Sequence, residues 1–369
     1  MVLRNQTQIA ILSFITLAVL PLHCAADETR KTNTALVIDN YDNETNRILI
    51  DFDINNPLGP DGKLHLQALK GISGPAKAAR FNLRMPTDDR GIQFNLFASR
   101  NEYTIDGSAS NFRPLGREDQ LGAGLTFPLI SEESHKLATH LELFRKDLRS
   151  EDSSIDFNEL SHINLLRLKL TDFFMDSEYN VTTFNFSVNH GNFILDSDDA
   201  RLAENAGRDA EGFFWVYKLK INHARRLLNA FKLQLSAQAQ KASRNLSASE
   251  KMYLGGPFGV MSYPAGEAGG DEGLLLTMRL GHDIPFDIDG QLEAALLAQY
   301  GEVQFDHTDY AWSLDPNTTS MAGVGLGLTY RFSTRLTAQL DHVYRTGEIY
   351  EFTNTDSDHQ TWFSLRITL

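Results

Sequence analysis

The sequence predicts an all-β protein, a 16-stranded antiparallel transmembrane β-barrel with a long inserted sixth loop. Three observations lead to this fold class: an N-terminal secretory signal, repeated alternation of apolar and polar residues, and connections that are alternately long and short. Their combination is typical of bacterial outer-membrane proteins, in which each strand turns one side to lipid and the other to water.

The chain begins with the features of a signal peptide. Arg4 precedes an apolar run over residues 9–22, and small residues follow at 24–26. The run is about 14 residues long, short of the ~20 that a membrane-spanning helix needs, and no stop-transfer pattern follows it. We therefore predict cleavage after Ala26, which assigns residues 1–26 to the signal peptide and sends the rest of the chain out of the cytoplasm.

Composition argues against several functional classes. Cys24 is the only cysteine and lies in the predicted signal, so the mature chain offers no thiol for a disulfide, a zinc site or a nucleophile. His23 stands where lipoprotein signals have a small residue, which disfavours lipid attachment at Cys24. The net charge of −14 argues against a nucleic-acid binder that relies on phosphate contacts. No nucleophile elbow or helix-borne metal motif is present, so we expect neither enzyme activity nor a cofactor.

Apolar residues recur at every second position through most of the remaining chain. In residues 231–240 the odd-numbered positions are apolar and the even-numbered ones are Lys, Gln or Ser. A strand with one face in lipid and one in water shows this period of two. The pattern persists to the last residue, Leu369. The predicted strands span residues 34–40, 46–54, 63–71, 77–86, 91–104, 118–129, 135–147, 159–170, 180–190, 212–222, 230–241, 273–283, 288–301, 321–332, 335–346 and 360–369.

The number and spacing of these segments favour a closed barrel. An even number brings both termini of a single-chain bacterial barrel to the periplasmic side. The odd-numbered connections average about 15 residues and the even-numbered ones about 6, as expected of long extracellular loops and short periplasmic turns. The alternative is a secreted sandwich or solenoid, whose strands also alternate. Against it, aromatic residues at strand ends are predicted to form an interfacial girdle; these are Tyr103, Trp215, Tyr300, Tyr330, Phe332 and Trp362.

The polar rows are predicted to face a water-filled lumen. Glycines at 323, 325 and 327 alternate within the predicted strand 321–332, where they would thin the lumenal wall beside an inserted loop. The predicted lumen-lining residues are Lys218, Lys220, Lys232, Gln234, Gln238 and Arg366.

Three acidic segments on predicted extracellular loops contain residue types that bind divalent cations, at 196–200, 306–309 and 356–359. Acidic loop residues are more often simply solvated. No metal site is therefore predicted.

The eleventh connection, which is the sixth of the predicted extracellular loops, is the longest, and its glycines and prolines are concentrated in residues 254–273. Such residues let a backbone fold back tightly and approach other surfaces closely. We therefore predict a hairpin that is tucked into the lumen.

This loop resembles the sixth loop of the two-partner secretion transporters, the TpsB proteins of the ShlB/FhaC/HecB type, which share a superfamily with the BamA barrel-assembly proteins. Segments near residues 39–59 and 322–327 resemble other parts of that barrel. The resemblance covers nearly the whole mature chain and implies sixteen strands. The matching loop positions are the family's Leu-Gly-Gly element (Leu254, Gly255, Gly256), its Val-Arg-Gly-Tyr element (Val260, Met261, Ser262, Tyr263) and its closing run (Gly266, Glu267, Gly270, Asp271, Gly273).

The sequence departs from the family at a lumenal ion pair. In the family the loop arginine is held by an aspartate of a Phe-x-Asp-x-Gly motif on the thirteenth strand. Here Met261 replaces the arginine and Gln299 replaces the aspartate, two residues before Gly301. Losing one partner alone would leave an unpaired charge, which destabilises a protein by about 3–5 kcal/mol if the charge is buried. We therefore hypothesise a coupled change, with the loop still in the lumen but held by apolar contacts and neutral hydrogen bonds.

The family also carries two client-capturing POTRA domains ahead of the barrel. Here we expect only a short segment, residues 27–33, before a barrel over 34–369. The terminal aromatic read by the assembly machinery is replaced by Leu369. The resemblance implies export or activation of an unfolded, TpsA-like exoprotein of haemolysin or adhesin type. Its other implied partners are outer-membrane lipid, lipopolysaccharide and the barrel-assembly machinery. The alternative is a passive pore or a non-transporting barrel.

Overall fold

The structure is a computed structural model. It describes residues 32–41, 46–58, 60–72, 76–87, 91–104, 115–152, 157–204, 207–227, 231–285, 289–311, 313–347 and 357–369. The predicted signal peptide and Asp356 lie outside these residues.

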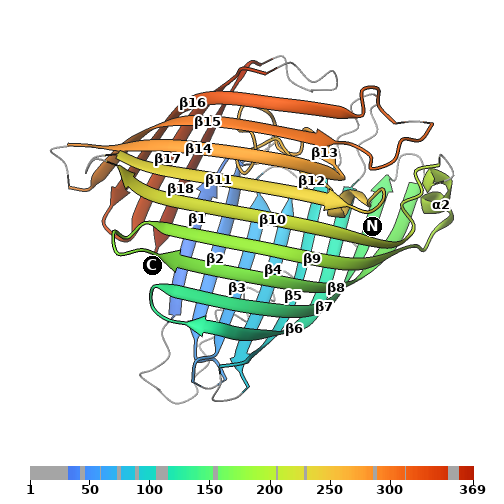
Figure 1. The fold of residues 1–369 in the computed structure, drawn as a ribbon, viewed down its shortest axis with the longest axis horizontal. Coiled ribbons are helices and arrows are strands. Elements are labelled where there is room, and N and C mark those ends of the chain that lie inside the picture. Colours follow the sequence, from blue (N-terminus) through green and yellow to red (C-terminus); the bar gives the residue numbers. More distant parts are fainter. Residues whose placement is uncertain are drawn as a thin grey trace.

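Sixteen strands within the described residues close into one antiparallel barrel, as predicted, because β1 pairs with β18 (Figure 1). The barrel strands are β1 (Thr32–Asp39), β2 (Arg47–Asn55), β3 (Lys63–Gly71), β4 (Lys77–Pro86), β5 (Gln93–Thr104), β6 (Leu115–Ser131), β7 (His135–Asp152), β8 (Phe157–Met175), β9 (Val181–Leu195), β10 (Gly212–Leu227), β11 (Phe231–Ala242), β14 (Glu272–Ile284), β15 (Gln291–Gln304), β16 (Thr318–Phe332), β17 (Leu336–Arg345) and β18 (His359–Thr368).

Strands β6 to β10 are longer than predicted. The largest difference is at β8, which has 19 residues where the sequence pattern predicted 159–170. A barrel strand needs only about 9–11 residues to cross the bilayer. Beyond the bilayer both faces of a strand meet water, so the alternation that marks the lipid-facing part is lost while the pairing continues.

The register confirms the predicted orientation of the strands. Leu235, Leu276 and Leu326 lie on the outer face and are 41–63% exposed, as lipid-facing side chains are. The described residues include no helix long and apolar enough to span a membrane.

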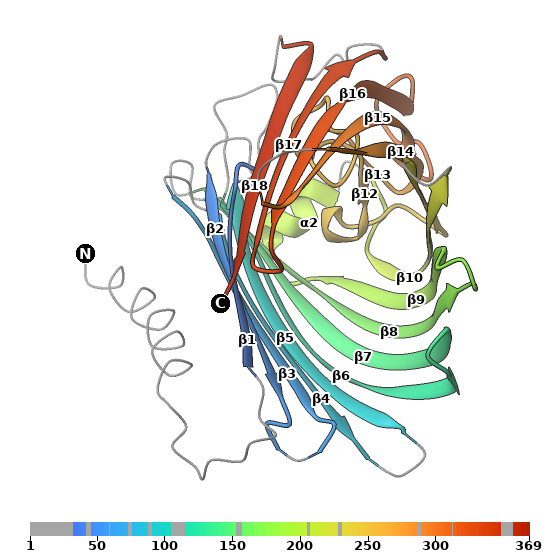
Figure 2. The same cartoon turned by 90° about the vertical axis from the view of Figure 1, so that its left-hand side faces the viewer.

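The predicted sixth loop, which connects β11 and β14, lies inside the ring of strands (Figure 2). We call residues 243–271 loop six. It contains a 3-10 turn, η1 (Ala248–Glu250), and a small hairpin formed by β12 (Met252–Tyr253) and β13 (Gly269–Gly270). Most of its buried apolar side chains form one cluster with the barrel wall, and Leu246 joins a second cluster on the inner faces of β7 to β11.

The predicted aromatic girdle is wrong at two of its six positions. Trp215 and Phe332 do lie on the outer face, each 43% exposed. Trp362 points into the lumen and is only 3% exposed. Tyr103 also faces inward, because it pairs with Gly116 on the inner face of β6 and its ring covers that glycine. The prediction relied on closeness to a strand end, whereas the alternation of the pleat decides the face.

The connections differ in length on the two sides of the barrel, as predicted. The turns at 132–134 and 333–335 have three residues each, whereas the opposite side carries loop six and the connections 305–317 and 196–211. The last of these contains a short helix, α2 (Asp198–Glu204), that the strand pattern did not predict.

Candidate functional site

Loop six packs its apolar side chains tightly against β15 and β16. Leu254, Val260 and Tyr263 are completely buried. A Cβ atom at Gly301 of β15 would lie 2.8 Å from the Leu254 side chain and 3.3 Å from that of Val260. The wall therefore needs glycine at this position for the loop to approach so closely.

Glycines also shape the loop itself. Gly256 and Gly266 have φ angles of 96° and 76°, a region that other residues rarely adopt. A Cβ at Gly255 would clash with the Pro264 carbonyl and with Glu267. Near the end of the loop, side chains at Gly270 and Gly273 would clash with β15. The glycines of the predicted motif thus allow the hairpin to fold and to lie against the wall.

Neutral hydrogen bonds fix the tip of loop six. The Met261 N–H donates to Gln299 Oε1 at 2.8 Å, and Gln299 Nε2 donates to the Gly259 carbonyl at 2.7 Å. A side-chain amide both donates and accepts, so Gln299 satisfies two backbone groups without bringing a charge into the lumen. The structure thus brings Met261 and Gln299 together, as hypothesised.

Two other strands contact the same tip. Trp362 Nε1 donates to the Met261 carbonyl at 2.7 Å. Ser262 Oγ donates to the Ala322 carbonyl at 3.3 Å, and a Cβ at Gly323 would clash with that hydroxyl. Of the three alternate glycines, Gly323 is therefore the one that makes room for the loop.

Tyr263 of loop six contacts a charged side chain of the barrel wall. The guanidinium of Arg345, on β17, lies 4.6 Å from the centre of the Tyr263 ring. This is a cation-π geometry.

The hypothesis that only apolar contacts and neutral hydrogen bonds hold the loop is wrong at its base. Glu250 is 1% exposed, and its carboxylate lies 2.7 Å from Lys146 Nζ of β7 and 3.6 Å from Lys218 Nζ of β10. Burial alone would raise the pKa of Glu250, but the two lysines outweigh it and hold the pKa below its ordinary value. Glu250 therefore remains a carboxylate that ties loop six to two strands.

The next residue, Lys251, makes a second charged contact. Its Nζ lies 3.1 Å from Asp271 and 3.4 Å from Asp306, which belongs to the connection 305–317. Burial raises the pKa of Asp271 even though Lys251 and backbone N–H groups favour its charged form. Gln240 Nε2 donates to the carbonyls of both Glu250 and Asp271. Consecutive residues of opposite charge thus fix the base of the loop.

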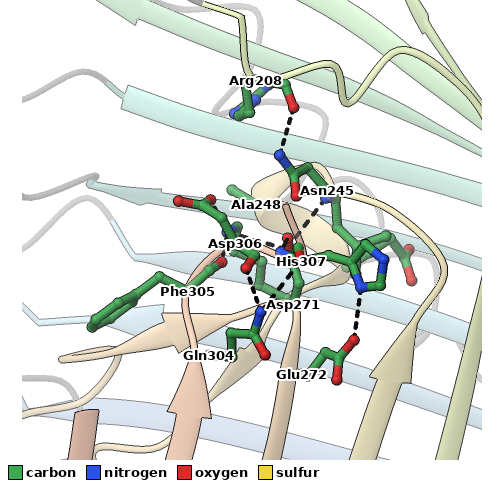
Figure 3. A network of polar contacts seen from close by, with 12 residues as sticks. Arg208, Asn245, Ala248, Asp271, Glu272, Gln304, Phe305, Asp306 and His307 are labelled. Atoms are coloured by element: carbon green, nitrogen blue, oxygen red, sulfur yellow. Dashed lines mark hydrogen bonds and ion pairs between the residues drawn. The ribbon is translucent and has the colours of Figure 1, made fainter. Parts of the chain in front are cut away.

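A polar network joins this base to neighbouring connections (Figure 3). The His307 N–H donates to Asp271 at 2.9 Å, and its imidazole lies 2.8 Å from the Glu272 carboxylate. Asn245 Nδ2 donates to the carbonyls of Arg208 and Thr308. Loop six, the connection 305–317 and the connection 196–211 are therefore linked by hydrogen bonds.

The acidic segments considered as cation ligands are occupied by protein partners. Asp306 accepts from Ser313, and Asp309 accepts from Asn317. In the segment 196–200, the Asp196 carboxylate lies 2.7 Å from His162 Nδ1, and Ser197 accepts from the Ala200 N–H at the start of α2. At the third segment the Asp358 carboxylate lies 2.9 Å from His359, a contact that lowers the pKa of Asp358. Across the described residues, no group of three or more potential ligands is placed to hold a metal.

The six predicted lumen residues all share the inner-face register. Lys232 contacts Asp283 at 2.6 Å and Glu293 at 3.4 Å, and Arg366 lies 3.6 Å from Asp51. These two side chains are therefore held in ion pairs. Lys218, Lys220, Gln234 and Gln238 lie on β10 and β11.

Sequence reasoning missed the other lumenal ion pairs. Arg279 Nη1 lies 3.0 Å from Asp341, which is 1% exposed, and Arg47 lies 2.8 Å from Asp39. The alternating pattern does place these residues among the inward-facing polar positions. It does not show which charged residue of another strand each of them pairs with.

The chain is similar to known proteins both in its match to a family model and in its sequence. Residues 22–330 match the family model of the haemolysin secretion/activation protein ShlB/FhaC/HecB. Two curated relatives, both the "Heme/hemopexin transporter protein HuxB", come from Haemophilus influenzae strains 86-028NP and ATCC 51907 / DSM 11121 / KW20 / Rd. They are 23% and 22% identical over 349 residues, 92% of this chain and 60% of theirs. The chain thus spans about three fifths of the length of these relatives.

Solved structures share the fold. CdiB from Escherichia coli superposes with a TM-score of 0.73 at 17% identity, covering 92% of this chain and 63% of that one. BamA from Haemophilus ducreyi lacking POTRA domains 1–3 superposes with a TM-score of 0.64 at 11% identity, covering 92% and 70%.

Proposed function

The chain belongs to the haemolysin secretion/activation family ShlB/FhaC/HecB, and from this premise we propose that it exports or activates an unfolded exoprotein through its lumen. Members of this family are transporters of the bacterial outer membrane, where barrels of the BamA type reside. The client is proposed to be a secreted protein of the haemolysin or adhesin type that crosses as an extended chain.

The observation that carries the proposal is loop six inside a closed barrel. Leu254, Val260 and Tyr263 anchor it to one wall, and its tip lies beside Gln299. A passive pore has no need of a folded hairpin with its own anchoring contacts on several strands. A transporter benefits from one, because a loop that narrows the lumen at rest can move when a polypeptide enters.

The inner wall also suits an extended polypeptide. Lys218, Lys220, Gln234 and Gln238 offer both charged and neutral hydrogen-bonding groups to passing backbone. We propose that the exoprotein passes along this part of the lumenal wall. Residues 1–26 are proposed to act as the signal peptide, with outer-membrane lipid, lipopolysaccharide and the barrel-assembly machinery as the remaining partners.

Export in a reconstituted strain tests the proposal. The full chain is co-expressed with a two-partner exoprotein, chosen from the neighbouring reading frame, in a strain that lacks other transporters of this class. Secreted exoprotein is then measured by immunoblotting of the medium. We expect export with the native chain and its loss when residues 254–263 are deleted, provided that both barrels reach the outer membrane. Absence of export, together with bilayer conductance that the deletion leaves unchanged, would instead identify a passive pore.

A further inference from the structure

A recess of about 240 Å³ opens on the inner faces of β8 to β11, beside Met252 of loop six. Its lining includes Lys169, Lys218 and Lys220, together with polar side chains from β9 and β11. None of the lining residues, all of which the structure describes, is a carboxylate. A recess of this size is smaller than the roughly 300–1,000 Å³ of pockets that take drug-sized ligands, so its occupant would be a small group.

The strand register brings the lysines together. Lys169 pairs with Ser187, and Ser187 pairs with Lys218, so these three residues form one row across β8, β9 and β10. Strands lie about 4.8 Å apart, which puts the two lysine Cα atoms roughly 10 Å from each other. Lys220 is two residues along β10 on the same face. An anion between these side chains is within reach of all three ammonium groups.

The protein neutralises these lysines only in part. Within the described residues, the ion pairs of these three lysines include only the 3.6 Å contact of Lys218 with Glu250. Glu250 is itself shared with Lys146, which lies closer at 2.7 Å. Like charges side by side on one face of a sheet destabilise it. The arrangement therefore leaves a surplus of positive charge in a chain whose net charge is −14.

The other lining groups suit an oxyanion. Ser187 supplies a hydroxyl, and Asn185 and Gln238 supply amide N–H donors on the same inner face. Charged donors give the shortest and strongest hydrogen bonds to phosphate and carboxylate oxygens. We propose that this recess binds a multiply charged oxyanion, either a free phosphate-type anion in the pore or the clustered carboxylates of an acidic polypeptide segment. The inference goes beyond the proposed function, and only its polypeptide alternative rests on that function.

Equilibrium dialysis of the detergent-folded full chain against radiolabelled pyrophosphate tests the site. Low salt is used because exposed charges are screened by added ions. We expect saturable binding that weakens about tenfold or more in Lys169→Gln and Lys220→Gln, because each removes one charged donor. The variants Lys169→Arg and Lys220→Arg keep the charge and are expected to keep the binding. Lys63→Gln is the matched control, since Lys63 is an inner-face lysine of β3, far around the barrel.

A competition experiment identifies the source of the anion. An extended peptide of alternating aspartate and glycine is compared with its asparagine counterpart. Displacement of pyrophosphate by the aspartate peptide alone would assign the site to polypeptide carboxylates. Failure of both peptides to compete would assign it to free anions.

Two outcomes would overturn the inference: no saturable binding to the native chain, or equal binding by the lysine-to-glutamine variants and the control. The heat-dependent gel mobility of each variant shows whether its barrel has folded. Because dialysis needs no exoprotein, absent binding with intact export contradicts only the anion site. Absent export with intact binding contradicts only the proposed transport.

Discussion

The amide of Gln299 holds the backbone of loop six at Met261, accepting from its N–H at 2.8 Å while donating to the Gly259 carbonyl at 2.7 Å. Gln299 is only 6% exposed, so a charge placed there would be largely cut off from water. The relationship explains how a loop that lacks the family's arginine keeps its position, since one neutral side chain satisfies two backbone groups.

Proximity of the two residues in membranes is the first prediction. A Met261→Cys and Gln299→Cys double variant is expected to form a disulfide or to be joined by a short bifunctional thiol reagent. Because Cys24 is the only native cysteine and lies in the predicted signal peptide, the cross-link can be read from a gel shift after oxidation. Each single variant is the control. Consistent failure of the double variant to couple would place the loop tip elsewhere.

Restoring the family's charges one at a time should destabilise the barrel. Gln299→Asp puts an unpaired carboxylate in a buried position and removes the donor to Gly259. We expect it to lower the free energy of unfolding by about 3 kcal/mol. Met261→Arg is expected to cost less, because its longer side chain can reach water. The double variant should be more stable than the sum of the two losses, since the charges then pair. Urea unfolding of all four chains gives the coupling energy, and simple additivity would contradict direct pairing.

Room at Gly323 is the third prediction. Gly323→Ala introduces a methyl group that clashes with Ser262, and such overpacking costs about 1–3 kcal/mol. Ser262→Gly in the same chain should recover most of the loss, because it removes the atoms that clash. Thermal unfolding measures both variants. Equal destabilisation with and without Ser262→Gly would show that the clash is not with loop six.

Removal of the buried carboxylate at the loop base should have a large effect. Glu250→Gln leaves Lys146 and Lys218 without their shared partner, which should cost about 3 kcal/mol. Hydrogen exchange of the loop-six amides is expected to accelerate. Lys241→Gln is the control, because its pair with Glu272 is on the surface, with 70% of the lysine side chain exposed, and should contribute less than about 1 kcal/mol.

The same carboxylate sets a pH dependence. The pKa of Glu250 is below its ordinary value of 4.5 in the folded state, since Lys146 and Lys218 outweigh burial. Its stabilising contribution is therefore fully present above pH 4.5 and is lost only as pH falls through the lower folded-state pKa. The difference in melting temperature between the native chain and Glu250→Gln should stay constant from neutral pH to about pH 5. A difference that shrinks already near neutral pH would contradict this assignment.

The fold was predictable because each strand obeys one local rule. Alternation placed Lys218 and Gln238 on the inner face and Leu235 on the outer face without knowledge of any partner strand. The contacts that hold loop six follow no such rule. Lys146 and Glu250 are separated by 104 positions in the sequence and meet only after the barrel closes. For Trp362, nearness to a strand end suggested lipid, and only the register shows that its ring faces the lumen.

Loop six is held unequally at its two ends. Its base, at Glu250 and Lys251, is fixed by buried charges whose separation would leave ions stranded in a poorly hydrated space. At its tip, Met261 and Ser262 are held by neutral hydrogen bonds, which water can replace at a small net cost of about 1 kcal/mol each. Loop six therefore has a base that is firmly fixed and a tip that can be released. A polypeptide that pushes against loop six would therefore displace it first at Met261. This movement would widen the lumen beside β15, while the contacts at Glu250 act as a hinge and stay in place.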